Sequence, residues 1–556
     1  MHSSLFRPAL CVAVGSALGE LRFDGAHADY RSQRPAAHAF FGALGPRAPP
    51  AITARTCRGT PRRARESRGA RCIIACAAAF PIESMARTLS APTRLSTAAA
   101  LLFACAACQH VPLAPIDAAA NGERIAARTL SDASVQAALA RHELPAGADA
   151  WSLDQLTLAA WMLRTDVAVA RSEVEAARAT TGVAGQRPNP NVQTTTERVI
   201  SGGPDPWVLG AALAMTFELG GKREIRREGA LARERAAEWA FGEALWSARA
   251  SVRGALLELA LASASIELDA DEVRLTRDYL DWVDTRLRYG AATTAERLAA
   301  VQALNEATSR RELDGVEVAR ASATLAASVG VTPAELKRVQ TVLPALRDVP
   351  ALADADVNAA RDVALVNRLD VRRALEDYAV AEQDLRAAVA TQYPDLTLAP
   401  GYLLDQADHK ITLGLDLPVP LFHNANAAIR RALAERAVAA AKFDDTQAAA
   451  LAAIDVAVAE YGAARAALVA VEQGERDAAD TVTQLERRLA AGAANRGQLL
   501  AGEIALAGLK RATLAARRAL LDAVTALEQG VERPLYPSSQ IDAGGALREL
   551  LVGPPP

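Results

Sequence analysis

The feature that most constrains the fold is an internal duplication of the chain. Arg164-Thr165-Asp166-Val167 resembles Arg368-Leu369-Asp370-Val371 at a shift of 204 residues, which is 368 minus 164. Further matches are Ile225-Arg226-Arg227 with Ile429-Arg430-Arg431 at the same shift and, after a small slip, Gly290-Ala291-Ala292 with Gly492-Ala493-Ala494. The body of the protein is therefore a tandem duplication of one structural unit.

Each copy predicts the same order of elements: a helix, two strands, a very long helix, a glycine-marked turn and a returning helix. The first helix is expected over 152–186 and 354–392, where Pro188 and Pro394 forbid continuation. The strands are expected at about 192–199, 206–219, 395–404 and 410–420, and the long helices over 222–288 and 425–489. Each proline-free long helix could reach on the order of 100 Å, and its apolar residues at alternating steps of three and four favour a coiled coil over an ordinary core helix.

The predicted strands have one apolar side and one small or polar side. Leu209, Leu213 and Phe217 alternate with Gly210, Ala212 and Thr216, and the second copy repeats the pattern. A soluble sandwich is the alternative for one strand alone, but two matching hairpins favour a transmembrane barrel. Since a barrel needs at least about eight strands, several chains must share it.

Composition excludes some classes of function. Aromatic residues make up only 4% of the chain, which suits long packed helices better than a globule. The net charge of -3 and the lack of a basic stripe argue against nucleic acid as a partner. All six cysteines lie at or before Cys108, so the body needs no disulfide and holds no thiolate-bound metal.

The segment 85–104 resembles a bacterial export signal. Arg87 and Arg94 precede a short apolar run that is too short to span a bilayer. The run ends at Cys105, our first candidate for lipid attachment, with Cys108 as the second and ordinary cleavage without lipid as the alternative. Because a signal should begin a chain, we expect translation to start at Met85 and residues 1–84 to be a mis-assigned or disordered extension.

No catalytic constellation is found in the sequence. It contains no Walker loop, no GxSxG elbow and no HExxH pair, and the histidines of the body, His110, His142, His409 and His423, are scattered. We therefore expect neither an enzyme, nor a cofactor, nor a resident metal site. A lone loop histidine such as His409 is more often simply polar than a metal ligand.

Several motifs resemble the TolC-like outer-membrane factors, and within them the CzcC-like branch that serves heavy-metal efflux pumps. The resemblance covers about 115–532 and rests on GQRPNPNV (185–192), FELGGKREIRREGAL (217–231), LPVPLFHNANAAIRRA (417–432), RLRYGAATTAERL (286–298) and RLAAGAANRGQLL (488–500). ELGGKR carries most of the weight for the metal branch.

The resemblance implies a mainly helical fold with a membrane β-barrel. Three identical chains would form a helical tube and share a twelve-stranded barrel, with four strands from each chain. The turns would contact a periplasmic adaptor, which binds an inner-membrane pump of the RND type; the turn residues are Tyr289, Gly290, Ala291, Ala292, Ala491, Gly492, Ala493 and Ala494. The family's pore-narrowing carboxylates correspond to Glu296 and, without the charge, to Gln498, so the place of the gate stays open.

We expect five segments: the extension 1–84, the signal 85–104, the repeats 105–340 and 341–534, and a disordered tail 535–556. The predicted function is the passive outer-membrane exit duct of a tripartite efflux pump, lipid-anchored and reaching into the periplasm, with heavy-metal cations as cargo. A duct for drugs or for type I protein secretion is the alternative from the same fold. A periplasmic coiled-coil scaffold is the alternative from another class.

Overall fold

The computed structural model describes residues 111–145, 150–200, 206–344, 346, 354–406, 408–422 and 424–535. The chain divides into two units, Met1–Leu113 and Ala114–Pro556, and every element below belongs to the second unit. The expected extension, the signal, Cys105, Cys108, His110, His423 and the tail from residue 536 lie outside the described residues.

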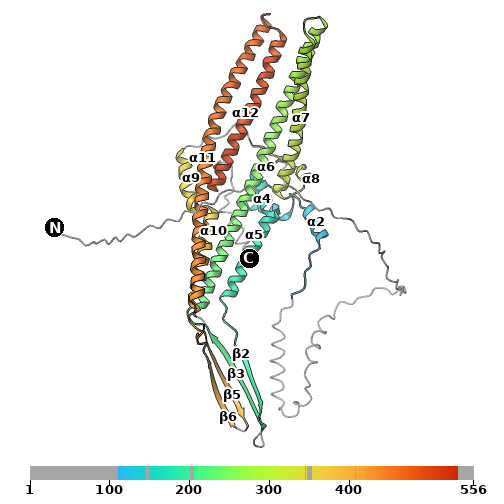
Figure 1. Cartoon of the computed structure of the whole chain (residues 1–556). Coiled ribbons are helices and arrows are strands. Elements are labelled where there is room, and N and C mark those ends of the chain that lie inside the picture. The colour runs from blue at the N-terminus through green and yellow to red at the C-terminus, as the bar shows by residue number, and fades with distance from the viewer. Residues whose placement is uncertain are drawn as a thin grey trace, which may run out of the picture. The chain divides into compact units, whose positions relative to one another are not determined.

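The two repeats contain the same elements in the same order (Figure 1). Repeat one has α4 (Leu153–Leu163), α5 (Thr165–Ala184), β2 (Asn191–Arg198), β3 (Trp207–Phe217), α6 (Lys222–Arg288) and α7 (Thr294–Val329). Repeat two has α9 (Asp354–Asn367), α10 (Leu369–Ala390), β5 (Leu396–Asp405), β6 (Asp408–Asp416), α11 (Asn426–Ala490) and α12 (Arg496–Val531). The duplicated, mainly helical fold is confirmed.

The expectation of one continuous first helix in each repeat is wrong, because the helix breaks at Arg164 and at Arg368. Both arginines have extended backbone, with ψ of 138° and 143°, and each serves as the N-cap of the following helix. The side chain of Asp166 accepts the backbone N–H of Val167, and Asp370 accepts that of Val371. The first N–H groups of a helix have no partner within the helix, and each carboxylate accepts a hydrogen bond from one of them. These hydrogen bonds stabilise the break.

Four strands form one antiparallel sheet in the order β2-β3-β5-β6. The repeats meet at its centre, where β3 pairs with β5 and Ala211 lies opposite Tyr402. A second, two-stranded sheet pairs β1 (Ala150–Trp151) with β4 (Gln340–Thr341) in parallel. Each repeat therefore contributes one hairpin to a common sheet.

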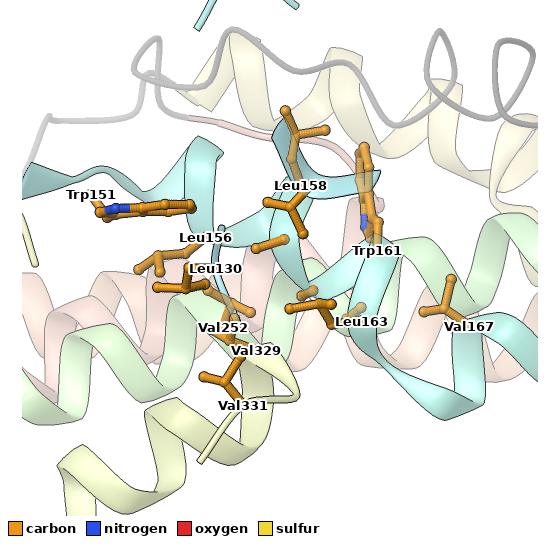
Figure 2. Close-up of a cluster of buried hydrophobic side chains, with 14 of the residues drawn as sticks. Leu130, Trp151, Leu156, Leu158, Trp161, Leu163, Val167, Val252, Val329 and Val331 are labelled. Carbon is orange, nitrogen blue, oxygen red and sulfur yellow. The ribbon is translucent and has the colours of Figure 1, made fainter. Parts of the chain in front are cut away.

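The largest apolar cluster surrounds the helix break of repeat one (Figure 2). Trp151, Leu156 and Trp161 are buried there together with Val252 of α6 and Val329 of α7. The helices α3 (Ala133–Arg141) and α8 (Pro333–Leu336) contribute Val135, Leu139 and Leu336 to this core, whereas α2 (Ala118–Ala126) carries no buried residue. The cluster fixes where the sheet-side helices join the long hairpins.

Two long helical hairpins, α6 with α7 and α11 with α12, extend away from the sheet (Figure 1). On the sheet side α6 packs against α10, and beyond the break it packs against α12. Among the residues that the structure describes, no helix is both long and apolar enough to cross a membrane. The chain thus has a four-stranded sheet at one end of α6 and α11, and two helical turns at the other.

Candidate functional site

The four-stranded sheet presents two chemically different faces. One face carries Leu209, Tyr402, Ile411, Leu413 and their neighbours, and Ile411 is 91% exposed. The opposite face carries mostly small or polar residues, among them Thr195, Gly210, Ala212, Gly401, Thr412, Gly414 and Asp416, together with the apolar Val208 and Leu403. An apolar outer face against a polar inner face is the pattern of a lipid-facing barrel wall.

Amphipathic side chains lie near the hairpin ends of the sheet. The Arg198 guanidinium lies 5.7 Å from the ring centroid of Trp207, and Tyr402 Oη forms a hydrogen bond with His409 Nδ1. Aromatic groups of this kind collect where a membrane meets water. His409 is thus engaged by a tyrosine, and no group of three or more potential metal ligands occurs in the described part of the chain.

The ELGGKR motif forms the connection between β3 and α6. Lys222 Nζ lies 2.7 Å from Asp395 Oδ1 just before β5, and Arg226 pairs with Glu218. The Arg223 side chain donates to the carbonyl of Gly185 at 2.6 Å. These contacts tie the start of α6 to both neighbouring chain segments, so the motif has a structural role at the rim of the sheet.

The Arg-x-Asp sequence that revealed the duplication forms a clasp in each repeat. Arg164 donates to Asp166 at 2.6 Å and to the carbonyl of Ser328 in the last turn of α7 at 3.1 Å. Arg368 makes the equivalent bonds to Asp370 at 2.7 Å and to the carbonyl of Gly530 at 2.5 Å. Each clasp joins the helix break to the end of the returning helix, where a cation is favourable.

The clasps differ most in the residue that ends the returning helix. Repeat one ends α7 with Gly330 at φ 89°, whereas repeat two ends α12 with Glu532 at φ 48°. The Glu532 carboxylate accepts the backbone N–H of Leu369 at 2.6 Å. Burial raises the pKa of Glu532 to about 7, against the lowering effect of that hydrogen bond. Repeat two therefore carries a titratable group where repeat one has none.

The predicted adaptor turns have the same conformation in both repeats. Gly290 has φ 69° and Gly492 φ 71°, the left-handed region in which glycine ends a helix at little cost. Arg286 donates to the carbonyl of Ala291, and Arg488 donates to that of Ala493 at 3.5 Å. The remaining predicted turn residues, Tyr289, Ala292, Ala491 and Ala494, flank these positions, and Tyr289 is 84% exposed.

The arginine brace of each turn was not recognised from the sequence. Both turns read Arg-Leu-x-x-Gly-Ala, with an arginine four residues before the glycine. The sequence did contain a signal for this contact. An arginine in the last turn of a helix can donate to the carbonyl groups that follow it.

Glu296 and Gln498, the predicted gate residues, are helix caps in the structure. The Glu296 carboxylate accepts the backbone N–H of Thr293 at 2.6 Å, and Thr293 Oγ1 accepts that of Glu296 at 3.1 Å. Asn495 and Gln498 form the same reciprocal pair. The hydrogen bond from Thr293 lowers the pKa of Glu296. The Thr-x-x-Glu pattern of a capping box was readable in the sequence but was not used.

A buried ionic cluster between α6, α7 and α12 was also missed. Asp269 and Glu272 of α6 are nearly inaccessible, and Glu272 pairs with Arg310 of α7 and Arg511 of α12. Burial and the neighbouring Asp269 raise the pKa of Asp314. No local sequence pattern predicts such a cluster, because its residues belong to helices that are far apart in the sequence.

Solved outer-membrane channels share this fold. VceC from Vibrio cholerae is 21% identical with a TM-score of 0.57, and the match covers 69% of this chain and 97% of VceC. CusC, whose structures concern folding and transmembrane channel formation, is 17% identical with a TM-score of 0.56 over 69% and 92%. The CmeC channel of Campylobacter jejuni is 14% identical with a TM-score of 0.57 over 80% and 97%.

Sequence comparison identifies the family. No curated protein matches the chain significantly. The model of the outer membrane efflux protein family matches residues 156–331 and 360–531, one segment in each repeat. With more than half of its length matched, the chain belongs to the outer membrane efflux protein family, whose members are passive channels rather than enzymes.

Proposed function

We propose that three copies of this chain form the exit duct of a tripartite efflux pump, with a shared twelve-stranded barrel in the outer membrane and a helical tube in the periplasm. The outer membrane is the location that the family implies. Cargo would pass through the tube without chemical change. The inner-membrane pump of the RND type would select the cargo and supply the energy.

The two unpaired edges of the sheet carry this proposal. Among the described residues, β2 and β6 each pair on one side only, so the sheet ends at both. The β6 edge presents Ile411, Leu413 and Leu415, which are 91%, 72% and 66% exposed. In a membrane, unpaired backbone groups and open sheet edges are not tolerated. Pairing β6 of one copy with β2 of the next closes a barrel and satisfies both edges.

The two helical turns are the surfaces through which the chain would contact a periplasmic adaptor. The braced turns at 289–292 and 491–494 are the exposed ends of the long hairpins, and their small residues allow another helical tip to approach closely. Glu296 and Gln498 lie one helical turn further on. Glu296 would add negative charge at the mouth of the tube and favour cations there, while it also caps α7.

Heavy-metal cations are the proposed cargo, on the strength of the CzcC-like motifs alone. The contacts of ELGGKR serve the connection between β3 and α6, so they support the metal branch only as a family signature. Lipid attachment at Cys105 or Cys108 would add an anchor to the barrel. Drug efflux and protein secretion remain the alternatives for the same duct.

The first experiment compares a deletion strain with its parent on zinc, cobalt, cadmium, copper and silver, and on a panel of hydrophobic drugs. Selective metal sensitivity that the intact gene restores supports the metal duct. Sensitivity to drugs alone keeps the duct and rejects metal as cargo.

Purified protein tests the duct itself. A trimer that changes its gel migration on heating and conducts ions in planar lipid bilayers is expected. A monomer that washes off outer membranes without detergent would instead indicate a periplasmic scaffold.

A further inference from the structure

Repeat two has an open groove at a place where repeat one has a covered core. The groove has a volume of about 790 Å³ and lies between α9, α11 and α12, which pack against one another (Figure 1). Its wall is mostly apolar and includes Val458, Tyr461, Val469 and Leu527. Val458 is 39% exposed and Val469 is 59% exposed, so part of this apolar surface faces water. Covering it would be favourable.

The duplication identifies the matching surface of repeat one. In the middle of the long helices the repeats correspond at a shift of 202, which is 460 minus 258, and Glu258 matches Glu460. Residues Val458, Tyr461 and Leu527 of the groove therefore correspond to three residues that lie in the large apolar core of repeat one or pack against it, namely Leu256, Leu259 and Leu325.

In repeat one, part of the cover comes from the chain that follows the returning helix α7. Leu336 is buried in the large core, and Val339 packs against that core. Further along the chain, Leu346 packs against the apolar cluster that contains Leu257 and Leu261 of α6. The segment after α7 thus covers apolar side chains of α6.

The chain that follows α12 repeats part of this segment. Ala345-Leu346-Arg347-Asp348 corresponds to Ala546-Leu547-Arg548-Glu549 at a shift of 201, which is 547 minus 346. This shift is close to the 202 of the neighbouring helices, so Leu547 stands almost as far beyond α12 as Leu346 stands beyond α7. In a helical turn, Leu547, Leu550 and Leu551 would lie on one side.

The tail begins beside the groove. Leu535, the last residue that the structure describes, packs against Ala457 and Leu527, and Leu527 also lines the groove. The groove runs along about 16 Å of α11, from residue 458 to residue 469. Residues 536–545 could span about 30 Å when extended. The segment that follows them is therefore long enough to reach any part of the groove.

We propose that the C-terminal segment 546–552 binds in the groove of repeat two, with its leucines against Val458 and Tyr461. It covers α11 as the segment around Leu346 covers α6. This assignment replaces the disordered tail that we expected from the sequence. Because the segment belongs to the same chain as the groove, the inference does not depend on the proposed trimeric duct.

An engineered cysteine pair tests the position of the segment in the purified full-length protein, because no natural cysteine follows Cys108. Leu547→Cys with Val458→Cys should form a disulfide within one chain, identified by mass spectrometry of the linked peptides. The control pair is Arg548→Cys with Val458→Cys, since Arg548 would lie on the side of the segment that faces away from the groove. The control should link at least about fivefold less, because a disulfide requires closely spaced and correctly directed side chains.

A second measurement follows the exposure of the groove through the rate at which a maleimide labels Val458→Cys. Adding Leu547→Asp and Leu551→Asp should raise this rate at least about tenfold, because charged side chains would release the segment from an apolar surface. Adding Arg548→Gln instead should leave the rate within about twofold.

Linked dimers on a non-reducing gel without a disulfide inside one chain would overturn the inference and assign the groove to the tail of a neighbouring chain. Absence of any linkage, or a labelling rate that the two aspartates do not change, would also overturn it. A protein that neither forms trimers nor conducts ions would reject the duct but would leave both of these measurements valid.

Discussion

The two repeats share one framework but differ in how the helix break is packed. In repeat one, α3, α8 and the small sheet cover a large apolar core that includes Trp151 and Trp161. In repeat two, the corresponding cluster consists of Ala360, Ala364, Ile454 and Val531, with Leu535 packed against it. Duplication has preserved the hydrogen-bonded clasp and the turns, whereas apolar packing has diverged. Stability is therefore expected to depend more on repeat one than on repeat two.

The largest effect should come from the core of repeat one. Trp161→Ala removes a buried indole whose Nε1 donates to the carbonyl of Leu245 at 2.8 Å, and should lower the free energy of unfolding by about 3–5 kcal/mol. Leu365→Ala, at the matching position of repeat two, should cost below about 2 kcal/mol, since Leu365 is only half-buried. Urea unfolding in detergent, followed by circular dichroism, measures both. Equal losses would contradict the asymmetry of the cores.

The next effect is a pH dependence confined to repeat two. The folded pKa of Glu532 is about 7, above its ordinary 4.5, so between these values the folded state holds a proton that the unfolded state has released. Stability from this group is complete below about pH 4.5 and falls as the pH rises to 7. Glu532→Gln should therefore stabilise the protein at pH 8 by on the order of 2–3 kcal/mol and leave it unchanged at pH 4.

Thermal melting at pH 4, 6 and 8 checks this prediction, with Gly330→Ala as a comparison at the matching site of repeat one. The glycine variant should lose stability equally at every pH, because alanine is strained at φ 89° and has no titratable group. If the difference in melting temperature between Glu532→Gln and the parent is the same at every pH, titration of Glu532 is ruled out as its cause.

Breaking the clasps should have a moderate effect in both repeats. Arg164→Ala and Arg368→Ala each remove the hydrogen bonds to an aspartate and to a helix-end carbonyl, at a cost of about 1–2 kcal/mol. The loss should be larger for Arg368, whose side chain is 12% exposed against 18% for Arg164. Its removal also takes away a positive charge that lowers the pKa of Glu532. Thermal melting of the two single variants and of the double variant measures these losses of stability. A larger loss in Arg164→Ala than in Arg368→Ala would contradict the prediction.

The smallest change in stability is expected at the caps. Gln498→Glu gives repeat two the carboxylate that repeat one has in Glu296, and a negative charge at a helix N-terminus should add roughly 0.3–1 kcal/mol. If Glu296 also lines the conducting path, the same variant should raise the preference for potassium over chloride in bilayer recordings. A gain in stability without any change of the reversal potential would assign both residues to capping alone.

The sequence predicted those parts of the fold that depend on local patterns. The absence of proline over 222–288 predicted α6 with the bounds that the structure has, and period-two alternation predicted the strands to within a few residues. The break at Arg164 was missed because Leu163-Arg164-Thr165 contains neither glycine nor proline. The clasp that stabilises the break depends on the carbonyl of Ser328, which lies 164 positions away in the chain.

The candidate site was predicted in position but not in its contacts. Both turns and both cap residues were identified, yet the capping boxes and the arginine braces went unrecognised. The contact of Trp282 in α6 with Gly497 in α12 and the pairing of Glu272 with Arg511 join different repeats, so no periodicity within one repeat can reveal them. Glu532 shows the same limit, because its raised pKa arises from burial at a junction with α10.

The length of α6 determines the distance between the two ends of the molecule's helical part. An unbroken helix advances by about 1.5 Å per residue, so the number of residues between Lys222 and Arg288 sets how far the turn at Gly290 stands from the sheet. Adding seven residues would move that turn outward by about 10 Å while nearly preserving the helix faces. Because α6, α7, α11 and α12 pack side by side, the same insertion would be needed in all four. The distance between the sheet and the turns is therefore expected to change only through matched insertions of about one heptad in all four helices.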